Sequence, residues 1–178
     1  MKIDPSELDF PILHDGINTD HFVCNKKPDS HRLQYFFRKH AMDNQNQKLS
    51  VTWVAVKKDC PTEPLGYFSL ACASIKADDL LEQEREGLPP YPAYPALLIG
   101  KFAVHDKCHN HGVGTAMMEY VFGLTIRLSE KFGCKYLIVE SKPTVTWFYE
   151  NKKRNFVRAV ELEGGNVLFY KNTLTFFQ

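Results

Sequence analysis

Residues Ile99 to Phe122 read IGKFAVHDKCHNHGVGTAMMEYVF, and they carry the clearest structural signal in the chain. The apolar run Ala96–Val104 is typical of a central, buried strand, although Lys101 interrupts it. A polar turn over His105–His111 comes next. Over Gly114–Phe132 the apolar residues recur at helical spacing. The predicted order is therefore a strand, a polar turn with glycines and a long helix.

The turn has features that suit a phosphate group. Helix N-termini present unpaired N–H groups and about half a positive charge. Gly112 and Gly114 keep side chains away from those donors, and Thr115 adds a hydroxyl. A Walker loop is excluded because no lysine follows Gly114, and a dinucleotide fingerprint fits poorly because Met117 replaces its third glycine. A phosphate site and a tight turn without a ligand are both consistent with these residues.

The same turn offers four soft or borderline metal ligands: His105, Cys108, His109 and His111. Zinc accepts such atoms, but the four residues are closer together than the ligands of a zinc finger. Because a helix start explains the turn without a metal, we expect no metal site.

Composition points to an ordinary soluble protein. The chain has 178 residues, 44% hydrophobic and 24% charged, which suits one domain spanning 1–178. Its net charge of +1 excludes a wholly basic nucleic-acid binder but allows a local patch. Five cysteines, odd in number and widely spaced, suit reduced thiols. With no signal-peptide pattern and no long apolar run, we expect a cytoplasmic protein without a membrane partner.

The rest of the chain predicts an α/β fold with a mixed sheet flanked by helices. A helix is expected over Asp29–Gln45, a second from Pro143 onward, and a short one in the first half of the otherwise irregular segment Lys76–Pro95. The further strands expected are Val51–Lys58, Gly66–Ile75, Lys135–Glu140, Phe156–Leu162 and Val167–Thr175.

The turn resembles that of the GNAT acetyltransferases, which place Arg/Gln-x-x-Gly-x-Gly/Ala between a strand and a helix and bind acetyl-CoA there. The corresponding residues are His109, in place of Arg or Gln, then Asn110, His111, Gly112, Val113 and Gly114. Family members also often carry a Phe-Tyr pair in a later helix, followed by a short link to Gly-Phe. Here the pair is Phe148–Tyr149, the link is longer, and Asn155 replaces the glycine before Phe156.

The resemblance covers most of the chain and is greatest to a branch that includes toxins acetylating aminoacyl-tRNA. It rests on Phe22, Cys24, the helix with Leu33 to Ala41, Leu65–Leu70, Tyr94–Ala96 and Leu98–Val104. It implies a single GNAT domain over 1–178. Its mixed, mostly antiparallel sheet would be splayed between Ala96–Val104 and Lys135–Glu140 to admit CoA.

The implied activity is acetyl-CoA-dependent N-acetylation of an amine. The resemblance assigns cofactor binding to Phe102, Ala103, Val104, His109, Asn110, His111, Gly112, Val113, Gly114 and Thr115. Tyr149 is the expected general acid for the CoA thiolate, the alternative being an aromatic packing residue. Cys108 is not expected to act as a nucleophile, since direct transfer needs no acyl-enzyme.

The acceptor is expected to be an α-amine. No carboxylate stands out as a base near the strand end, and an α-amine (pKa about 7.7–8.0) is far more neutral at pH 7 than a lysine (about 10.4). The run Lys152, Lys153 and Arg154 suits RNA phosphates or is a solvated helix end, and Lys101 stands where the toxin branch tends to have arginine.

Aminoacyl-tRNA is therefore the acceptor that the sequence favours, with an antitoxin and a second copy of the chain as further partners implied by the resemblance. The resemblance places acceptor contacts in the N-terminal helix and the segment Lys76–Pro95. Two alternatives stay open: acetylation of a small-molecule or protein amine, and a non-catalytic acyl-CoA sensor.

Overall fold

The computed structural model describes residues 2–27 and 29–176, which form two compact units. The first unit contains the chain up to Ala71 and Gly100–Gly123. The second contains Cys72–Ile99 and the chain from Leu124 onward. The expectation of a single domain over 1–178 stays a prediction.

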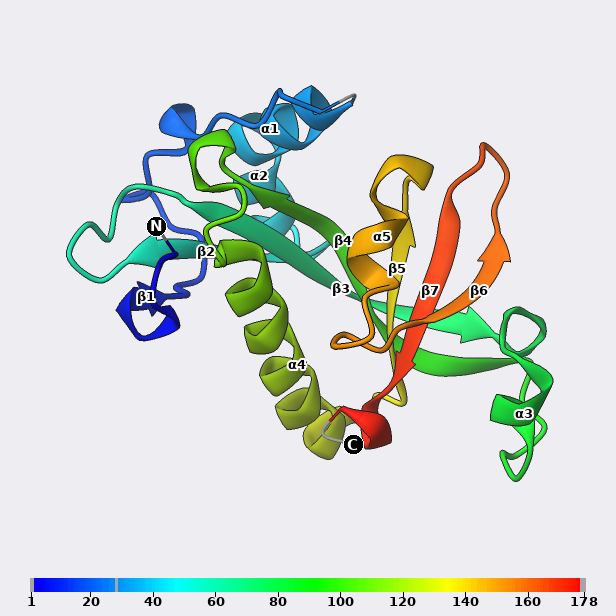
Figure 1. The fold of residues 1–178 in the computed structure, drawn as a ribbon. Coiled ribbons are helices and arrows are strands. Elements are labelled where there is room, and N and C mark those ends of the chain that lie inside the picture. The colour runs from blue at the N-terminus through cyan, green and yellow to red at the C-terminus, as the bar shows by residue number, and fades with distance from the viewer. Residues whose placement is uncertain (1, 28, 177–178) are drawn as a thin grey trace. The chain divides into compact units, whose positions relative to one another are not determined.

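The strands form a seven-stranded mixed sheet in the order β1-β2-β3-β4-β5-β7-β6 (Figure 1). The pairs β1–β2, β2–β3, β5–β7 and β6–β7 are antiparallel, and β4–β5 is parallel. This confirms the mixed, mostly antiparallel sheet. The strands are β1 (Leu8–Asp9), β2 (Val51–Lys57), β3 (Gly66–Lys76), β4 (Ala93–Val104), β5 (Tyr136–Ser141), β6 (Val157–Glu161) and β7 (Val167–Asn172).

The helices follow the expected order with one difference. They are α1 (Ser30–Lys39), α2 (Ala41–Asn46), α3 (Glu82–Arg85), α4 (Val113–Phe132) and α5 (Thr146–Tyr149). The single helix expected over Asp29–Gln45 is wrong, because His40 separates α1 from α2 with a φ of −127°. None of the described helices is long and apolar enough to cross a membrane.

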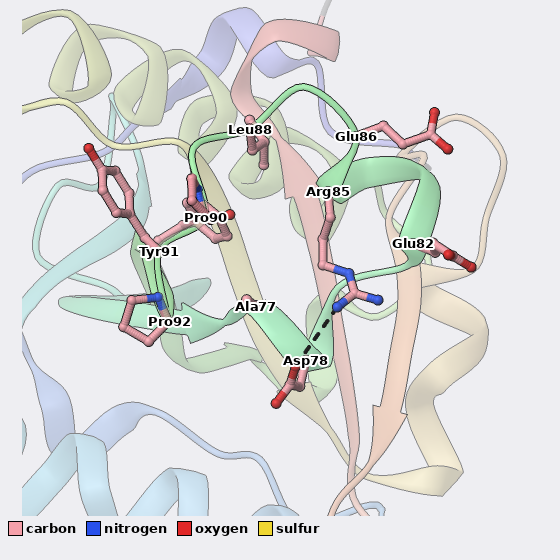
Figure 2. Close-up of a pocket in the computed structure, with 10 residues that line it drawn as sticks. Ala77, Asp78, Glu82, Arg85, Glu86, Leu88, Pro90, Tyr91 and Pro92 are labelled. Atoms are coloured by element: carbon pink, nitrogen blue, oxygen red, sulfur yellow. Dashed lines mark ion pairs between the residues drawn. The ribbon is translucent and has the colours of Figure 1, made fainter.

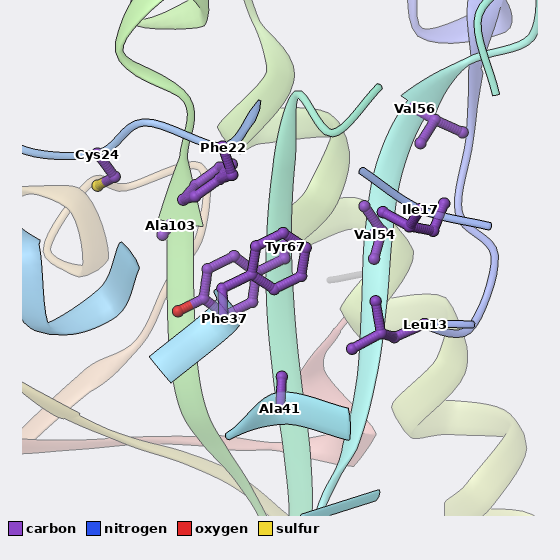
Figure 3. Packing of buried hydrophobic residues seen from close by; sticks show 10 residues of the cluster. All are labelled: Leu13, Ile17, Phe22, Cys24, Phe37, Ala41, Val54, Val56, Tyr67 and Ala103. Carbon is purple, nitrogen blue, oxygen red and sulfur yellow. The ribbon is translucent and has the colours of Figure 1, made fainter. Parts of the chain in front are cut away.

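The core of the first unit is aromatic. Figure 3 shows the rings of Phe22, Phe37 and Tyr67 gathered between α1 and the strands. The Phe37 and Tyr67 rings stack with centroids 4.3 Å apart, and the Tyr67 hydroxyl donates to the Leu33 carbonyl at 2.7 Å. Since the phenol is buried, this bond gives it the partner that it needs. The bond and the ring stacking fix α1 on β3.

Gly66 allows the first half of α4 to pack closely on the strands. A Cβ at this position would lie 2.6 Å from Met117 Sδ and 3.0 Å from the Ala103 carbonyl oxygen. Met117 is fully buried, so its side chain has no open space to move into. A glycine in β3 therefore determines how near the start of α4 comes to β4.

The core of the second unit contains a cluster of tyrosines, including Tyr94, Tyr136 and Tyr170. Glu84 ties α3 to this cluster, because its carboxylate accepts from the Tyr136 hydroxyl at 3.0 Å and from the Asn172 side-chain amide at 2.6 Å. The segment Lys76–Pro95 is thus more ordered than expected.

Two strand boundaries differ by three residues from the sequence-based expectation, and the others by at most one. Strand β4 begins at Ala93 and includes Pro95, which is tolerated near the start of a strand. Strand β7 ends at Asn172 and not at Thr175, because the Asn172 side chain accepts from the Leu174 N–H at 3.0 Å and caps a 3₁₀ turn. The short strand β1 was not expected.

Candidate functional site

The loop between β4 and α4 lies in the first unit and is shaped by local hydrogen bonds. The His105 N–H donates to the Leu65 carbonyl at 2.8 Å, and the His105 ring accepts from the Lys107 N–H at 3.1 Å. Asn110 and Gly112 both have left-handed backbones, with φ of 64° and 93°. Asparagine and glycine are the residues that adopt this conformation most readily. The loop therefore needs these two residue types where the sequence has them.

Helix α4 begins as the phosphate prediction requires. The Gly112 carbonyl accepts from the N–H groups of Thr115 and Ala116, both at 3.0 Å, so the helix starts at Val113. Val113 is fully buried and anchors the turn, whereas Thr115 is exposed. The first N–H groups of a helix have no carbonyl in a preceding turn, and they attract anions. The structure thus brings Asn110 to Thr115 together around the start of α4.

Asp106 is a buried carboxylate that the sequence analysis missed. One of its oxygens accepts from the Asn25 N–H at 3.0 Å, and its own N–H donates to the Val23 carbonyl at 2.8 Å. Its carbonyl accepts from Lys26 Nζ at 3.3 Å. Asp106 therefore ties the segment Val23–Lys26 to the loop. The only sequence signal was an acidic residue two positions after the end of the strand.

His109 points back toward the end of β4. Its Nε2 lies 3.1 Å from the Val104 carbonyl oxygen and 3.8 Å from Asp106 Oδ1. This histidine stands where GNAT enzymes usually have arginine or glutamine, and it supports the loop itself. Among the described residues, no group of three or more His, Cys, Asp or Glu side chains could hold a metal ion.

The end of β4 carries the main-chain groups predicted to pair with pantetheine, at Phe102, Ala103 and Val104. Ala103 is buried, and the other two are half-buried. Lys101 lies with Nζ 5.3 Å from the centre of the Phe36 ring, where a cation is attracted by the ring face. A pocket of about 150 Å³ is lined by Phe36, Asn44, Leu49, Ser50, Ser69, Gly100 and Lys101.

Tyr149 lies in α5 in the second unit and is enclosed by aromatic rings. The centroids of Phe148, Phe156 and Phe169 are 5.2, 5.6 and 5.8 Å from its own. Burial raises the pKa of the Tyr149 phenol, and the nearby Arg154 charge partly opposes this rise. The phenol is therefore protonated at neutral pH, as a general acid must be.

The basic run that follows Tyr149 is divided between packing and solvent. The Arg154 guanidinium lies 3.7 Å from the centre of the Phe148 ring and donates to the Phe148 carbonyl at 2.8 Å. Lys152 and Lys153 are exposed. Arg158 pairs with Glu150 and Glu161 at 3.0 and 2.8 Å. Of the expected patch, the structure leaves two lysines facing solvent.

Asn155 stands where the GNAT pattern has glycine, and its backbone conformation shows why asparagine fits there. Its φ is 51°, a left-handed backbone for which glycine is the usual residue. Asparagine is among the few other residues that accept it. The substitution of Asn for Gly before Phe156 therefore keeps the turn.

A second, larger hollow lies in the second unit. It measures about 760 Å³ and is lined by Ala77, Asp78, Glu82, Arg85, Glu86, Leu88, Pro90, Tyr91, Pro92 and Tyr94. Figure 2 shows Arg85 reaching toward Asp78, with the charged atoms 3.8 Å apart. Carboxylates dominate its polar lining, so it does not suit RNA phosphates.

No protein-family model matches the chain. Solved structures share its fold. A structure of AtaT complexed with acetyl-methionyl-tRNAfMet has a TM-score of 0.81 at 20% identity, over 94% of this chain and 96% of that one. AtaTR bound with AcCoA has a TM-score of 0.77 at 20% identity, over 96% of each chain.

A tyrosine-to-phenylalanine mutant of the AtaT toxin, bound to the C-terminus of the antitoxin AtaR, has a TM-score of 0.75 at 18% identity. That match covers 97% of this chain and 99% of the other. These likenesses confirm the GNAT-like fold expected from the sequence.

Proposed function

We propose that this protein is an acetyl-CoA-dependent N-acetyltransferase whose acceptor is the α-amine of an aminoacyl-tRNA. The observation that carries the proposal is the start of α4, where left-handed Gly112 ends the loop after β4 and opens the helix. The fold is that of proteins solved with AcCoA and with acetyl-methionyl-tRNA, which supports both the donor and the acceptor.

The first unit supplies the donor site in this proposal. The loop from His109 to Thr115 holds the pyrophosphate of CoA with main-chain N–H groups, and the Thr115 hydroxyl adds a donor. The main chain of Phe102–Val104 pairs with pantetheine. Because both contacts come from backbone, they require the loop conformation more than particular side chains.

The chemistry is a direct transfer. The neutral amine attacks the thioester carbonyl, an N–H near the end of β4 stabilises the oxyanion, and the C–S bond breaks to release CoA as a thiolate. Tyr149 gives its proton to the sulfur, and water takes the proton that the amine loses. An α-amine needs no strong base, since about a tenth of it is already neutral at pH 7.

The same proposal places the protein in the cytoplasm, with an antitoxin that neutralises it and with pairing into a homodimer. The five cysteines are all free thiols in the structure, which agrees with a reducing compartment. One of the similar structures contains an antitoxin C-terminus, which supports a partner of this kind.

The test is incubation of the pure protein with labelled acetyl-CoA and either charged total tRNA or a panel of small amines and polyamines. We expect label on charged tRNA that disappears after deacylation. Label on a small amine alone would replace the tRNA acceptor by a metabolite. Tight binding of CoA without any transfer would contradict the enzyme and favour an acyl-CoA sensor.

A further inference from the structure

Helix α1 is strongly basic. Its ten residues, SHRLQYFFRK, include Arg32, Arg38 and Lys39 and contain no carboxylate. Arg38 serves the fold, because its guanidinium donates to the Phe22 carbonyl at 2.7 Å. The other two cations are exposed and available for a partner.

The exposed cations share one face of α1 with an aromatic ring. Arg32, Tyr35 and Lys39 are three and four residues apart, so their side chains lie along one side of the helix. The Tyr35 residue is 60% exposed, and the His40 ring lies beside its ring, with centroids 5.2 Å apart. Arg32 lies 3.9 Å from Asp29, but exposed pairs of this kind contribute little. We call these three residues the α1 stripe.

The pocket under Lys101 adjoins this helix, because Phe36 belongs to its lining. The Ser69 hydroxyl pairs with Thr52 at 2.7 Å. The Lys101 ammonium lies over the Phe36 ring and forms no ion pair within the described part of the chain. Lys101 thus brings a cation to the lining of this pocket, where it can meet a phosphate or ribose oxygen.

We propose that the α1 stripe and this pocket bind the single-stranded end of the RNA that carries the acceptor amine. Arg32 and Lys39 contact phosphates, Tyr35 stacks on a base, and Lys101 takes a phosphate or ribose oxygen. This inference rests on the proposed function, since it assigns the RNA surface of that enzyme. It also moves the expected contact away from Lys152–Arg154.

The distribution of charge supports this choice. Residues 76–86 of the second unit include five carboxylates and two cations, Lys76 and Arg85, so this segment repels a phosphate chain. The exposed ring near Lys152 and Lys153 is that of Trp147, which belongs to the preceding helix α5, whereas Tyr35 lies between Arg32 and Lys39 on one face of α1. The α1 stripe has both elements that a single-stranded nucleic acid needs.

The first experiment measures binding of deacylated total tRNA at several salt concentrations. The double variant Arg32→Glu/Lys39→Glu should bind at least about tenfold more weakly, and the slope of log K against log salt should decrease by about 1.4, or about 0.7 for each lost phosphate contact. The matched control Lys152→Glu/Lys153→Glu reverses two exposed cations of the second unit and should bind nearly as wild type. Thermal melting of all variants verifies that they are folded.

The second experiment isolates stacking. Tyr35→Ala should weaken tRNA binding between about fivefold and a hundredfold, whereas Tyr35→Phe should bind as wild type because the ring is kept. A 2-aminopurine at the RNA end should be quenched by wild type and by Tyr35→Phe and not by Tyr35→Ala.

Three outcomes overturn the inference. The first would be that the α1 variants bind tRNA as tightly as wild type. The second would be that the Lys152→Glu/Lys153→Glu control loses tRNA binding while the α1 variants keep it. The third would be that the wild-type protein binds no tRNA. In the first two cases the acetyltransferase proposal stands whenever wild type still labels charged tRNA. In the third, label on small amines separates an enzyme with another acceptor from a protein without activity.

Discussion

The loop before α4 and the surroundings of Tyr149 are held in place by different kinds of force. In the first unit, left-handed Gly112 and a few main-chain hydrogen bonds shape the loop. In the second unit, three aromatic rings enclose one phenol. A backbone site tolerates side-chain changes but not conformational ones, and a site built on one side chain behaves in the opposite way. The predictions below test this contrast.

The largest effect is expected at Tyr149. Tyr149→Phe removes the hydroxyl and keeps the ring among Phe148, Phe156 and Phe169, so the fold and acetyl-CoA binding should survive. Loss of a general acid should lower kcat by about 10²–10⁴-fold. Steady-state kinetics and calorimetric titration with CoA test this. If kcat is unchanged, Tyr149 is a packing residue.

A conformational change should damage the other site. Gly112→Val places a β-branched residue at a φ of 93°, a strain of about 1–3 kcal/mol that shifts the loop. Acetyl-CoA affinity should fall between about fivefold and a hundredfold. The control Gly133→Val places the same residue at a left-handed position, with a φ of 65°, at the other end of α4, and it should cost stability alone. Equal losses of affinity in both variants would disprove a backbone site before α4.

The buried carboxylate of Asp106 should matter for stability. Asp106→Leu leaves the Asn25 N–H without its acceptor, which costs about 1–3 kcal/mol in the free energy of unfolding. Asp106→Asn keeps an acceptor oxygen and should cost less. Urea denaturation of both variants measures the difference. Equal stability of Asp106→Leu and wild type would mean that this bond does not hold the loop.

The pH dependence of transfer should be one-sided. Burial raises the pKa of Tyr149 above its ordinary value, so the acid stays protonated throughout the range in which the acceptor titrates. The rate at low acceptor concentration should rise by about tenfold from pH 6.8 to 8.8, as an α-amine with a pKa of about 7.8 becomes neutral. A decline in rate above pH 8 would mean that the acid has a depressed pKa when substrates are bound.

Local sequence signals predicted the central part of the fold well. The apolar run and the glycines gave β4, the loop and α4 to within three residues at each end, because each feature acts on neighbouring residues. The break at His40 depends on the backbone angles of one residue, which helical periodicity does not encode. The GNAT-like fold is confirmed, whereas the roles of Tyr149 and of the loop residues stay predictions.

Features that join distant residues could not be predicted in the same way. Asp106 bonds to Asn25, which is 81 residues away in the chain, so no local pattern contains their contact. In sequence, Arg154 belongs to a run of cations, which is most often solvated. Only the fold turns its guanidinium onto the Phe148 ring. The stripe on α1 is visible in sequence, but its exposure is not.

The smallest effect is expected at Asn155. This residue has a left-handed backbone and lies six residues after Tyr149, so it tests whether the Tyr149 site also depends on a backbone conformation. Asn155→Ala should destabilise the fold by about 1 kcal/mol, since alanine accepts a φ of 51° less readily than asparagine. Asn155→Gly should match wild type within about 0.5 kcal/mol by urea denaturation. If kcat is unchanged in both variants, this turn does not position Tyr149, and the surrounding aromatic rings hold the phenol in place. A kcat that falls in Asn155→Ala and not in Asn155→Gly would show that this site, too, depends on one left-handed residue.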